Sequence, residues 1–220
     1  YEGTFAESFS RRNRDKFNDY ATDVFGVQAN DKVQGVALWE TANGGRCRAA
    51  GLKGGITGFG AELFIIDDPI KDKEEAYSET IRDKIYDWYT STARTRVSPG
   101  GGIIVMATRW HIDDLVGRLL QVGQDNPNAS PWRVINYPAI AEHDEPHRKE
   151  GEALHPARYT LAMLEEIRAE VGERDWASMY QQRPLPAGGG VFKLDWVQYY
   201  ETLPPYWDKN QVFSIMFTFN

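Results

Sequence analysis

Two short apolar runs, each ending abruptly in polar residues, constrain the fold of this chain most strongly. The first covers residues 63–66 and is followed by Asp67 and Asp68, and the second covers residues 103–106 and is followed two positions later by Thr108. Continuous apolar runs of this length are typical of strands buried on both faces of a parallel sheet. We therefore predict an α/β fold in which a parallel sheet is flanked by helices.

The residues at the two strand ends carry side chains suited to phosphate chemistry. The paired carboxylates of Asp67 and Asp68 are hard oxygen ligands of the kind that hold Mg²⁺ beside nucleotide phosphates. Thr108 and Arg109 add a hydroxyl and a guanidinium that can contact or sense a phosphate group. The structural alternative is that the two aspartates only cap the turn after the strand. The polar residues at the two strand ends favour the core of a protein that is driven by nucleotide hydrolysis.

Charge and composition limit the partners that such a chain can have. The 220 residues carry a formal net charge of −7, which excludes a bulk nucleic-acid binder. Any contact with DNA would have to be local, through the basic cluster that contains Arg14, and a solvated helix face is the alternative explanation of that cluster. The single cysteine, Cys47, excludes an internal disulfide framework. No apolar run approaches the roughly 20 residues that span a bilayer, so no membrane partner is expected.

Hydrophobic spacing and turn residues predict the remaining elements. In chain order we expect helix 4–20 with Phe5, Phe9, Phe17 and Tyr20 facing inward, strand 33–40, turns within 44–60, strand 62–66, helix 72–96, a turn at 99–102, strand 103–108, helix 113–121, strand 132–137, helices 160–171 and 173–182, and a linker near 184–190. Strand 212–217 would then open another domain. We thus predict two domains, residues 1–185 and 186–220.

The glycine-rich stretch within residues 44–60 is not a phosphate-binding loop of the Walker A type. That loop requires Gly-x-x-x-x-Gly-Lys followed by Ser or Thr, because backbone N–H groups cradle the phosphates and the lysine meets the outer ones. Lys53 is followed by Gly54, and no window of the sequence fits the pattern. The glycines are better explained as turns.

Five motifs, in this order and at these separations, resemble the large terminase subunit of tailed bacteriophages. They are Thr57-Gly58-Phe59-Gly60-Ala61, Ile65-Ile66-Asp67-Asp68-Pro69-Ile70-Lys71, Glu75-Ala76, Ala107-Thr108-Arg109-Trp110-His111-Ile112-Asp113-Asp114-Leu115 and Tyr180-Gln181-Gln182-Arg183-Pro184. The resemblance covers nearly the whole chain. A lone Asp-Asp-Pro would be a weak motif, whereas the ordered series is specific.

The resemblance implies a P-loop NTPase-like motor joined to an RNase H-like endonuclease. ATP and Mg²⁺ would be the cofactors. Hydrolysis would drive double-stranded DNA into a procapsid, and the intact protein would then cut it. The portal protein and the small terminase subunit would be partners, with a homo-oligomeric ring at the portal, in the host bacterial cytoplasm.

The same resemblance assigns roles to individual residues. Asp67 would be the Walker B carboxylate, acting on Mg²⁺ through water, and Asp68 or Glu75 would polarise the attacking water. Thr108 would belong to the coupling motif that senses the γ-phosphate, with Arg109 beside it.

The remaining assignments are less definite. His111 and Arg14 are candidates for contacts in trans or with DNA. For Glu75 the structural alternative is a favourable position near a helix start, and for His111 it is a satisfied structural histidine. The choice of an arginine finger stays open among Arg11, Arg12, Arg14, Arg94 and Arg96.

The chain departs from the family pattern at both ends. The Walker A strand and loop would lie upstream of Tyr1, and the segment Ser214–Phe219 matches the first nuclease strand only in part. Met216 stands where that strand should carry a metal-binding aspartate, and a thioether is a poor ligand for a hard cation. By itself the chain is therefore expected to have impaired ATPase activity and no nuclease activity.

Two other functions are compatible with these residues. One is a catalytically inactive prophage remnant that acts at most as a binding module. The other is an unrelated P-loop motor of the helicase type, although helicase relatives usually have Asp-Glu rather than Asp-Asp-Pro at this strand end.

Overall fold

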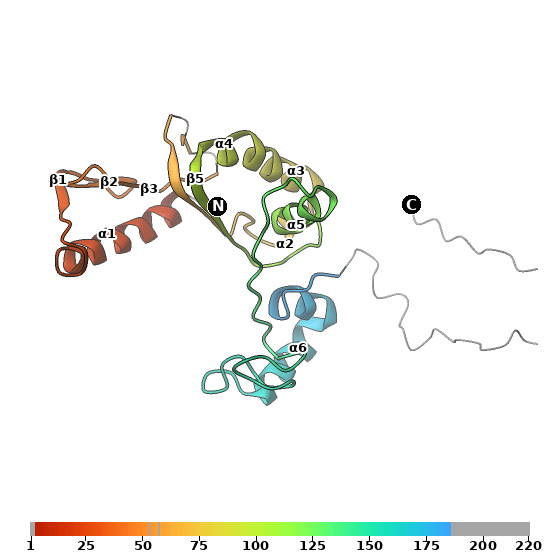
Figure 1. The fold of residues 1–220 in the computed structure, drawn as a ribbon. Helices are drawn as coiled ribbons and strands as arrows, with labels where there is room; N and C mark the ends of the chain where they lie inside the picture. The colour runs from red at the N-terminus through yellow and green to blue at the C-terminus, as the bar shows by residue number, and fades with distance from the viewer. Residues whose placement is uncertain (1–2, 53, 57, 186–220) are drawn as a thin grey trace, which may run out of the picture. The chain divides into compact units, whose positions relative to one another are not determined.

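The computed structural model describes residues 3–52, 54–56 and 58–185 (Figure 1). The chain divides into two units, residues 1–186 and 187–220. The predicted linker, strand 212–217 and Met216 lie outside the described residues, so the expected nuclease start stays a prediction.

The first unit combines helices with two small sheets (Figure 1). Its elements are α1 (Gly3–Phe25), β1 (Ala29–Gln34), β2 (Leu38–Thr41), β3 (Arg46–Arg48), β4 (Ala61–Asp67), α2 (Lys73–Tyr77), α3 (Glu79–Trp88), the π-helical turn η1 (Tyr89–Ala93), α4 (Arg94–Arg96), β5 (Val97–Met106), α5 (Leu115–Asp125), α6 (Leu161–Asp175) and the π-helical turn η2 (Trp176–Tyr180).

The strands β4 and β5 pair in parallel, as the two apolar runs predict. Ile65 lies opposite Ile104, and Asp67 lies opposite Met106. Side chains on one face of this pair pack into the main core, whose buried members are Ile66, Ile70, Ala76, Ile85, Tyr89, Ala93, Leu115 and Leu119. Burying each large apolar side chain contributes roughly 1.5–3 kcal/mol. Helices α2, α3 and α5 thus hold the carboxyl ends of the strands in place.

The opposite face of this sheet is apolar and exposed. Leu63, Ile65, Ile104 and Met106 are between 45% and 56% exposed. Parallel sheets are ordinarily covered on both faces. The prediction of a sheet flanked by helices is therefore met on one face only within the residues that the structure describes.

The N-terminal sheet is antiparallel, in the order β1-β2-β3. The single strand predicted at 33–40 is wrong, because the chain turns back between Gln34 and Leu38. At Gly35 a Cβ atom would lie 3.0 Å from the Leu38 carbonyl oxygen, so this turn favours glycine. Cys47 lies in β3, within the stretch predicted to form turns.

Helix α1 forms as predicted, and Phe17 faces inward as expected: its ring centroid lies 5.2 Å from that of Trp39. The other three predicted inward residues are exposed, Phe5 at 57%, Tyr20 at 55% and Phe9 at 41%. Two of the exposed rings pack on each other along α1: the ring centroids of Phe5 and Phe9 are 4.9 Å apart. The spacing of the aromatic residues predicted which of them share a side of α1, but it did not predict which side packs on the sheet.

Three further expectations are corrected. The helix predicted at 72–96 breaks at Ser78, which is extended with φ −81° and ψ 109°. Residues 99–102 belong to β5 instead of forming a turn. Residues 132–137 form no strand, and their apolar side chains, such as the 64% exposed Ile135, have no neighbouring strand among the described residues.

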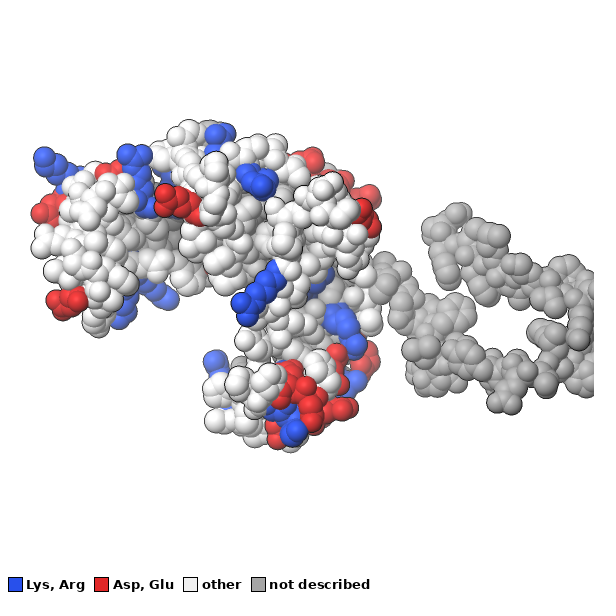
Figure 2. Space-filling model, viewed as in Figure 1, with Lys and Arg blue, Asp and Glu red and all other residues white. Residues whose placement is uncertain are grey.

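The two helices predicted between 160 and 182 are separated by Gly172, whose φ of 79° interrupts the helical backbone of α6. Thr160 caps α6, accepting a hydrogen bond from Met163 N at 3.3 Å. Ala153, Leu164 and Trp176 form a second, smaller core around this segment. On the face drawn in Figure 2, Asp and Glu side chains gather over the part of the chain around α6.

Candidate functional site

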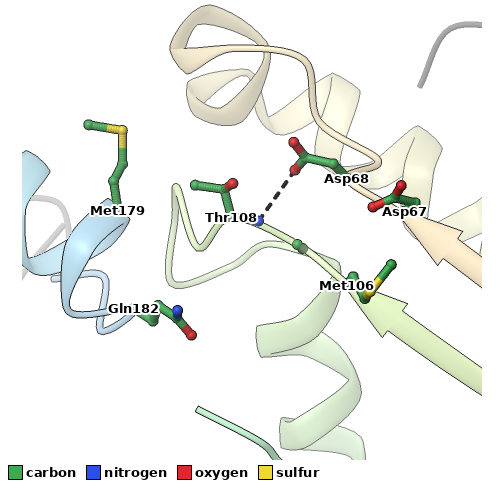
Figure 3. Close-up of a pocket in the computed structure, with 7 residues that line it drawn as sticks. Asp67, Asp68, Met106, Thr108, Met179 and Gln182 are labelled. Carbon is green, nitrogen blue, oxygen red and sulfur yellow. Dashed lines mark hydrogen bonds between the residues drawn. The ribbon is translucent and has the colours of Figure 1, made fainter. Parts of the chain in front are cut away.

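A cavity of about 270 Å³ opens at the carboxyl ends of β4 and β5. It is lined by Asp67, Asp68, Met106, Ala107, Thr108, Met179 and Gln182. Figure 3 shows the strand-end residues on one side and Met179 and Gln182 on the other. The carboxyl edge of a parallel sheet is the usual place for a ligand in α/β proteins. The structure thus brings Asp67, Asp68 and Thr108 together, as the strand pattern predicts.

Asp68 connects the two strand ends. Its backbone N–H donates to the Met106 carbonyl at 2.8 Å, and its Oδ1 accepts a hydrogen bond from Thr108 N at 3.3 Å (Figure 3). Its φ is 43°, a left-handed conformation that is uncommon outside glycine. Burial raises the pKa of the Asp68 carboxyl, and the nearby charge of Asp67 raises it further, while the Thr108 hydrogen bond opposes this shift.

The oxygen atoms at this edge are the chain's candidate ligands for a metal ion. Asp67 ends β4 with an exposed side chain, and Asp68 and the Thr108 hydroxyl lie close by in the same cavity. No cluster of three or more His, Cys, Asp or Glu side chains suited to a metal occurs among the described residues. This donor set fits Mg²⁺, which is commonly held by one or two carboxylates together with water and substrate phosphates.

Arg109 points away from the cavity lining. Its Nε donates to Asp114 Oδ2 at 2.8 Å, and the two side chains are 16% and 4% exposed. Asp114 also caps α5 by accepting from Gly117 N at 2.8 Å. The pair therefore fixes the loop that follows Thr108. Phosphate sensing by Arg109 stays a prediction that would require this ion pair to open.

His111 is held in a structural environment. Its Nδ1 accepts a hydrogen bond from Asp113 N at 3.0 Å, and its ring meets the edge of Tyr77 at 5.4 Å. Burial lowers the pKa of His111, and the positive charge of Arg82 lowers it further. These contacts favour a neutral structural histidine, and a contact of His111 in trans or with DNA stays a prediction.

Glu75 and Arg14 are likewise engaged in local contacts. Glu75 accepts from Lys71 N at 3.0 Å while Asp72 accepts from Glu75 N, also at 3.0 Å, an arrangement close to a capping box for α2. Arg14, whose side chain is 19% exposed, donates to the Gln34 carbonyl and joins α1 to β1. Neither residue lines the cavity, and their proposed roles stay predictions.

One family of proteins matches most of the chain. The sequence model described as "Terminase large subunit, T4likevirus-type, N-terminal" matches residues 7–199. The chain belongs to this family. Its members are ATPase and nuclease proteins of bacteriophage DNA packaging. Among curated proteins, none shows significant similarity to the chain.

Two cavity residues of this terminase chain were not singled out from the sequence. Met179 and Gln182 come from η2 and the turn after it, more than 70 residues beyond Thr108 in the chain. The motif Tyr180–Pro184 was available as a signal of family membership, but it gave no indication of where these side chains lie. As to membranes, none of the described helices of this terminase chain is long and apolar enough to cross one.

Proposed function

We propose that this chain is the motor portion of a terminase large subunit, in which Mg-ATP binds at the carboxyl ends of β4 and β5. Hydrolysis of ATP there drives double-stranded DNA into a procapsid. The observation that carries the proposal is the Asp68–Thr108 hydrogen bond at the edge of a cavity that also contains Asp67. This hydrogen bond connects the carboxylates of Asp67 and Asp68, which are suited to phosphoryl transfer, with the loop that follows β5.

Each side chain at the edge has a role in this proposal. Asp67 would hold Mg²⁺ through water, and the bound ion would supply positive charge beside the phosphates. Asp68 polarises the attacking water, because its burial and raised pKa suit a general base better than an unperturbed carboxylate. Glu75 is the less favoured base, since its carboxylate is bonded to Lys71 N. Thr108 senses the γ-phosphate and passes its state to the loop held by Arg109.

The partners follow from the packaging role. The portal protein and the small terminase subunit are the proposed protein partners, with several copies arranged in a ring at the portal in the host cytoplasm. DNA is cleaved by a nuclease domain that begins within residues 186–220. A net charge of −7 restricts DNA contact to local basic surfaces.

A catalytically inactive remnant is the second candidate. It is favoured by Met216, which stands where the first nuclease strand should carry a metal-binding aspartate. Such a chain would bind its partners without turnover. A helicase-type motor is disfavoured by the family match over residues 7–199.

Phosphate release from Mg-ATP by the chain extended upstream to include a Walker A loop separates the two candidates. A motor should give turnover that Asp67→Asn lowers at least about 100-fold, the effect expected for removing a metal-holding or acid–base group. Asp87→Asn, an exposed carboxylate on α3, is the matched control and should leave the rate unchanged. A folded chain without any turnover supports the remnant, and turnover that survives in Asp67→Asn contradicts the assigned site.

A further inference from the structure

Gln182 shares an unusual backbone feature with Asp68. Among the described residues other than glycine, only these two have a positive φ, 54° for Gln182 and 43° for Asp68. Both line the same cavity, although they are more than 100 positions apart in the chain. A left-handed conformation is unfavourable for residues with a Cβ atom, and such residues concentrate at functional sites. Two of them at one cavity single out Gln182 as well as Asp68.

The backbone on both sides of Gln182 is firmly fixed. The Gln181 side chain is buried and makes two 3.0 Å hydrogen bonds, accepting from Ile140 N and donating to the Ile140 carbonyl. Arg183 N donates to the Ala177 carbonyl at 2.7 Å. Because its neighbours are held in this way, Gln182 keeps its conformation without needing its own side chain for stability.

The Gln182 side chain itself is only weakly held. Its Nε2 donates to the Tyr137 carbonyl at 3.3 Å, a long bond, and the side chain is half-buried. Figure 3 shows it across the cavity from Thr108 and the two aspartates. Its amide group is therefore available to a ligand that enters the cavity.

The chemistry of an amide suits this position. Its NH₂ group can donate to a phosphate oxygen, and its carbonyl oxygen can accept from a water molecule. It carries no charge, so it adds no repulsion to the carboxylates of Asp67 and Asp68 at the opposite side. The Gln182 amide could therefore contact a phosphoryl group on one side of the cavity, while Asp67 and Asp68 would hold a metal ion on the other side.

The segment that carries Gln182 is attached to the strand-end region by other contacts. Lys73 Nζ donates to both carboxylate oxygens of Asp175, at 2.7 and 2.9 Å. The guanidinium of Arg174 lies 4.7 Å from the centroid of the Tyr77 ring. Helix α2, which follows the aspartate pair, is thus connected to the residues just before Gln182.

We propose that Gln182 binds the terminal phosphoryl group of ATP and so makes the site prefer ATP over ADP. This inference rests on the proposed function, because it requires Mg-ATP in the same cavity. Gln182 is then a specificity-determining residue supplied by the segment after α6. Its contact exists with ATP and is lost when the terminal phosphoryl group leaves.

The substitution Gln182→Gly gives the sharpest test. Glycine accepts a φ of 54° without strain, so the variant removes the side chain without disturbing the backbone. Calorimetric titration should show affinity for Mg-ATP lowered about tenfold, as for one lost hydrogen bond to a charged group, with affinity for Mg-ADP unchanged. The urea midpoint should be equal to or higher than that of the wild-type chain. Gln124→Ala, an exposed glutamine on α5, is the control and should change none of these values.

Other results overturn the inference in distinguishable ways. If Asp67→Asn weakens Mg-ATP binding but Gln182→Gly does not, the proposed function stands and the role of Gln182 is wrong. A lower urea midpoint with equal losses for ATP and ADP makes Gln182 structural only. A folded wild-type chain that binds neither nucleotide overturns the proposed function together with the inference.

A second measurement observes the contact directly. The side-chain amide signals that disappear from the nitrogen–proton NMR spectrum of Gln182→Gly identify this group in the wild-type spectrum. They should shift when Mg-ATP is added and shift less with Mg-ADP. Identical spectra with the two nucleotides would overturn the inference.

Discussion

Asp68 and Thr108, 40 positions apart in the sequence, are joined by a hydrogen bond of 3.3 Å from the Thr108 backbone N–H to Asp68 Oδ1. The bond lies just beyond the last paired residues of β4 and β5, Asp67 and Met106. Because Asp68 N also donates to the Met106 carbonyl at 2.8 Å, the two loops are linked in both directions. These two hydrogen bonds hold the ends of β4 and β5 together.

Asp68→Asn should separate stability from activity. Asparagine tolerates the left-handed backbone and can still accept the Thr108 hydrogen bond, but it removes a half-buried charge beside Asp67. We expect ATP turnover to fall at least about 100-fold, while the urea midpoint at pH 7 is unchanged or higher. Because the pKa of Asp68 is raised, any gain in stability should shrink on acidification towards the ordinary pKa of the carboxyl, where the wild-type side chain is also neutral. A clear loss of stability at pH 7 would contradict this description of the site.

The buried pair of Asp114 with Arg109 should be important for stability. Asp114→Ala removes the cap of α5 and leaves the Arg109 guanidinium, only 16% exposed, without its partner, so the free energy of unfolding should fall by about 3–4 kcal/mol. Asp114→Asn retains the cap, so its loss of free energy of unfolding should be about 1 kcal/mol smaller than that of Asp114→Ala. Urea denaturation measures both. Equal losses would mean that the cap contributes nothing, and losses below about 0.5 kcal/mol in both would contradict the stabilising role of the pair.

Lowering the pH should reduce the contribution of Asp113 to the free energy of unfolding. Hydrogen bonds from Arg118, and from the buried Arg82, hold the pKa of Asp113 below its ordinary value of 3.8. A lowered pKa in the folded state gives stability that is present above the unfolded value and is lost as the pH falls through the folded value. We expect Asp113→Asn to lower the free energy of unfolding by about 1 kcal/mol at pH 7, since the carboxylate is 42% exposed and partly screened.

The measurement for Asp113 is a series of urea titrations from pH 7 to pH 3, with Asp87→Asn as the exposed control. The difference between wild-type and Asp113→Asn should be constant from pH 7 to about pH 5 and should shrink as the pH falls below 3.8. A difference that stays constant over the whole range would show that the ion pairs of Asp113 are not its cause.

The two faces of the β4–β5 sheet should respond differently to truncation. Ile66 is 4% exposed within the main core, whereas its neighbour Ile65 is 53% exposed. Ile66→Ala should lower the free energy of unfolding by about 2–4 kcal/mol, and Ile65→Ala by less than about 1 kcal/mol. Chemical denaturation of the two variants makes the comparison. Similar losses would indicate that the face bearing Ile65 is covered in solution.

The strand ends could be predicted from the sequence because the relevant pattern is local. Continuous apolar runs indicated β4 and β5, and the carboxyl ends of neighbouring parallel strands share one edge. Asp67, Asp68 and Thr108 therefore had to converge. The family was also identified correctly from ordered motifs, and the match over residues 7–199 confirms it.

The errors have a common physical cause, which is that local patterns do not specify partners. Four aromatic residues of α1 were expected to face inward, yet Phe17 contacts Trp39 whereas Phe5, Phe9 and Tyr20 are exposed. Residues 132–137 have the composition of a strand but no strand beside them among the described residues. Gln182 could not be placed in the cavity, because a positive φ at a glutamine has no signal in the sequence.

Calorimetric titration of the 220-residue chain with Mg-ATP, repeated with Asp67→Asn, tests the central claim most directly. The account predicts measurable binding by the wild-type chain that is weakened at least about tenfold in the variant, because Asp67 holds the ion that bridges the phosphates. Equal binding by both chains, or no binding by a wild-type chain shown to be folded, would contradict a Mg-ATP site at the ends of β4 and β5.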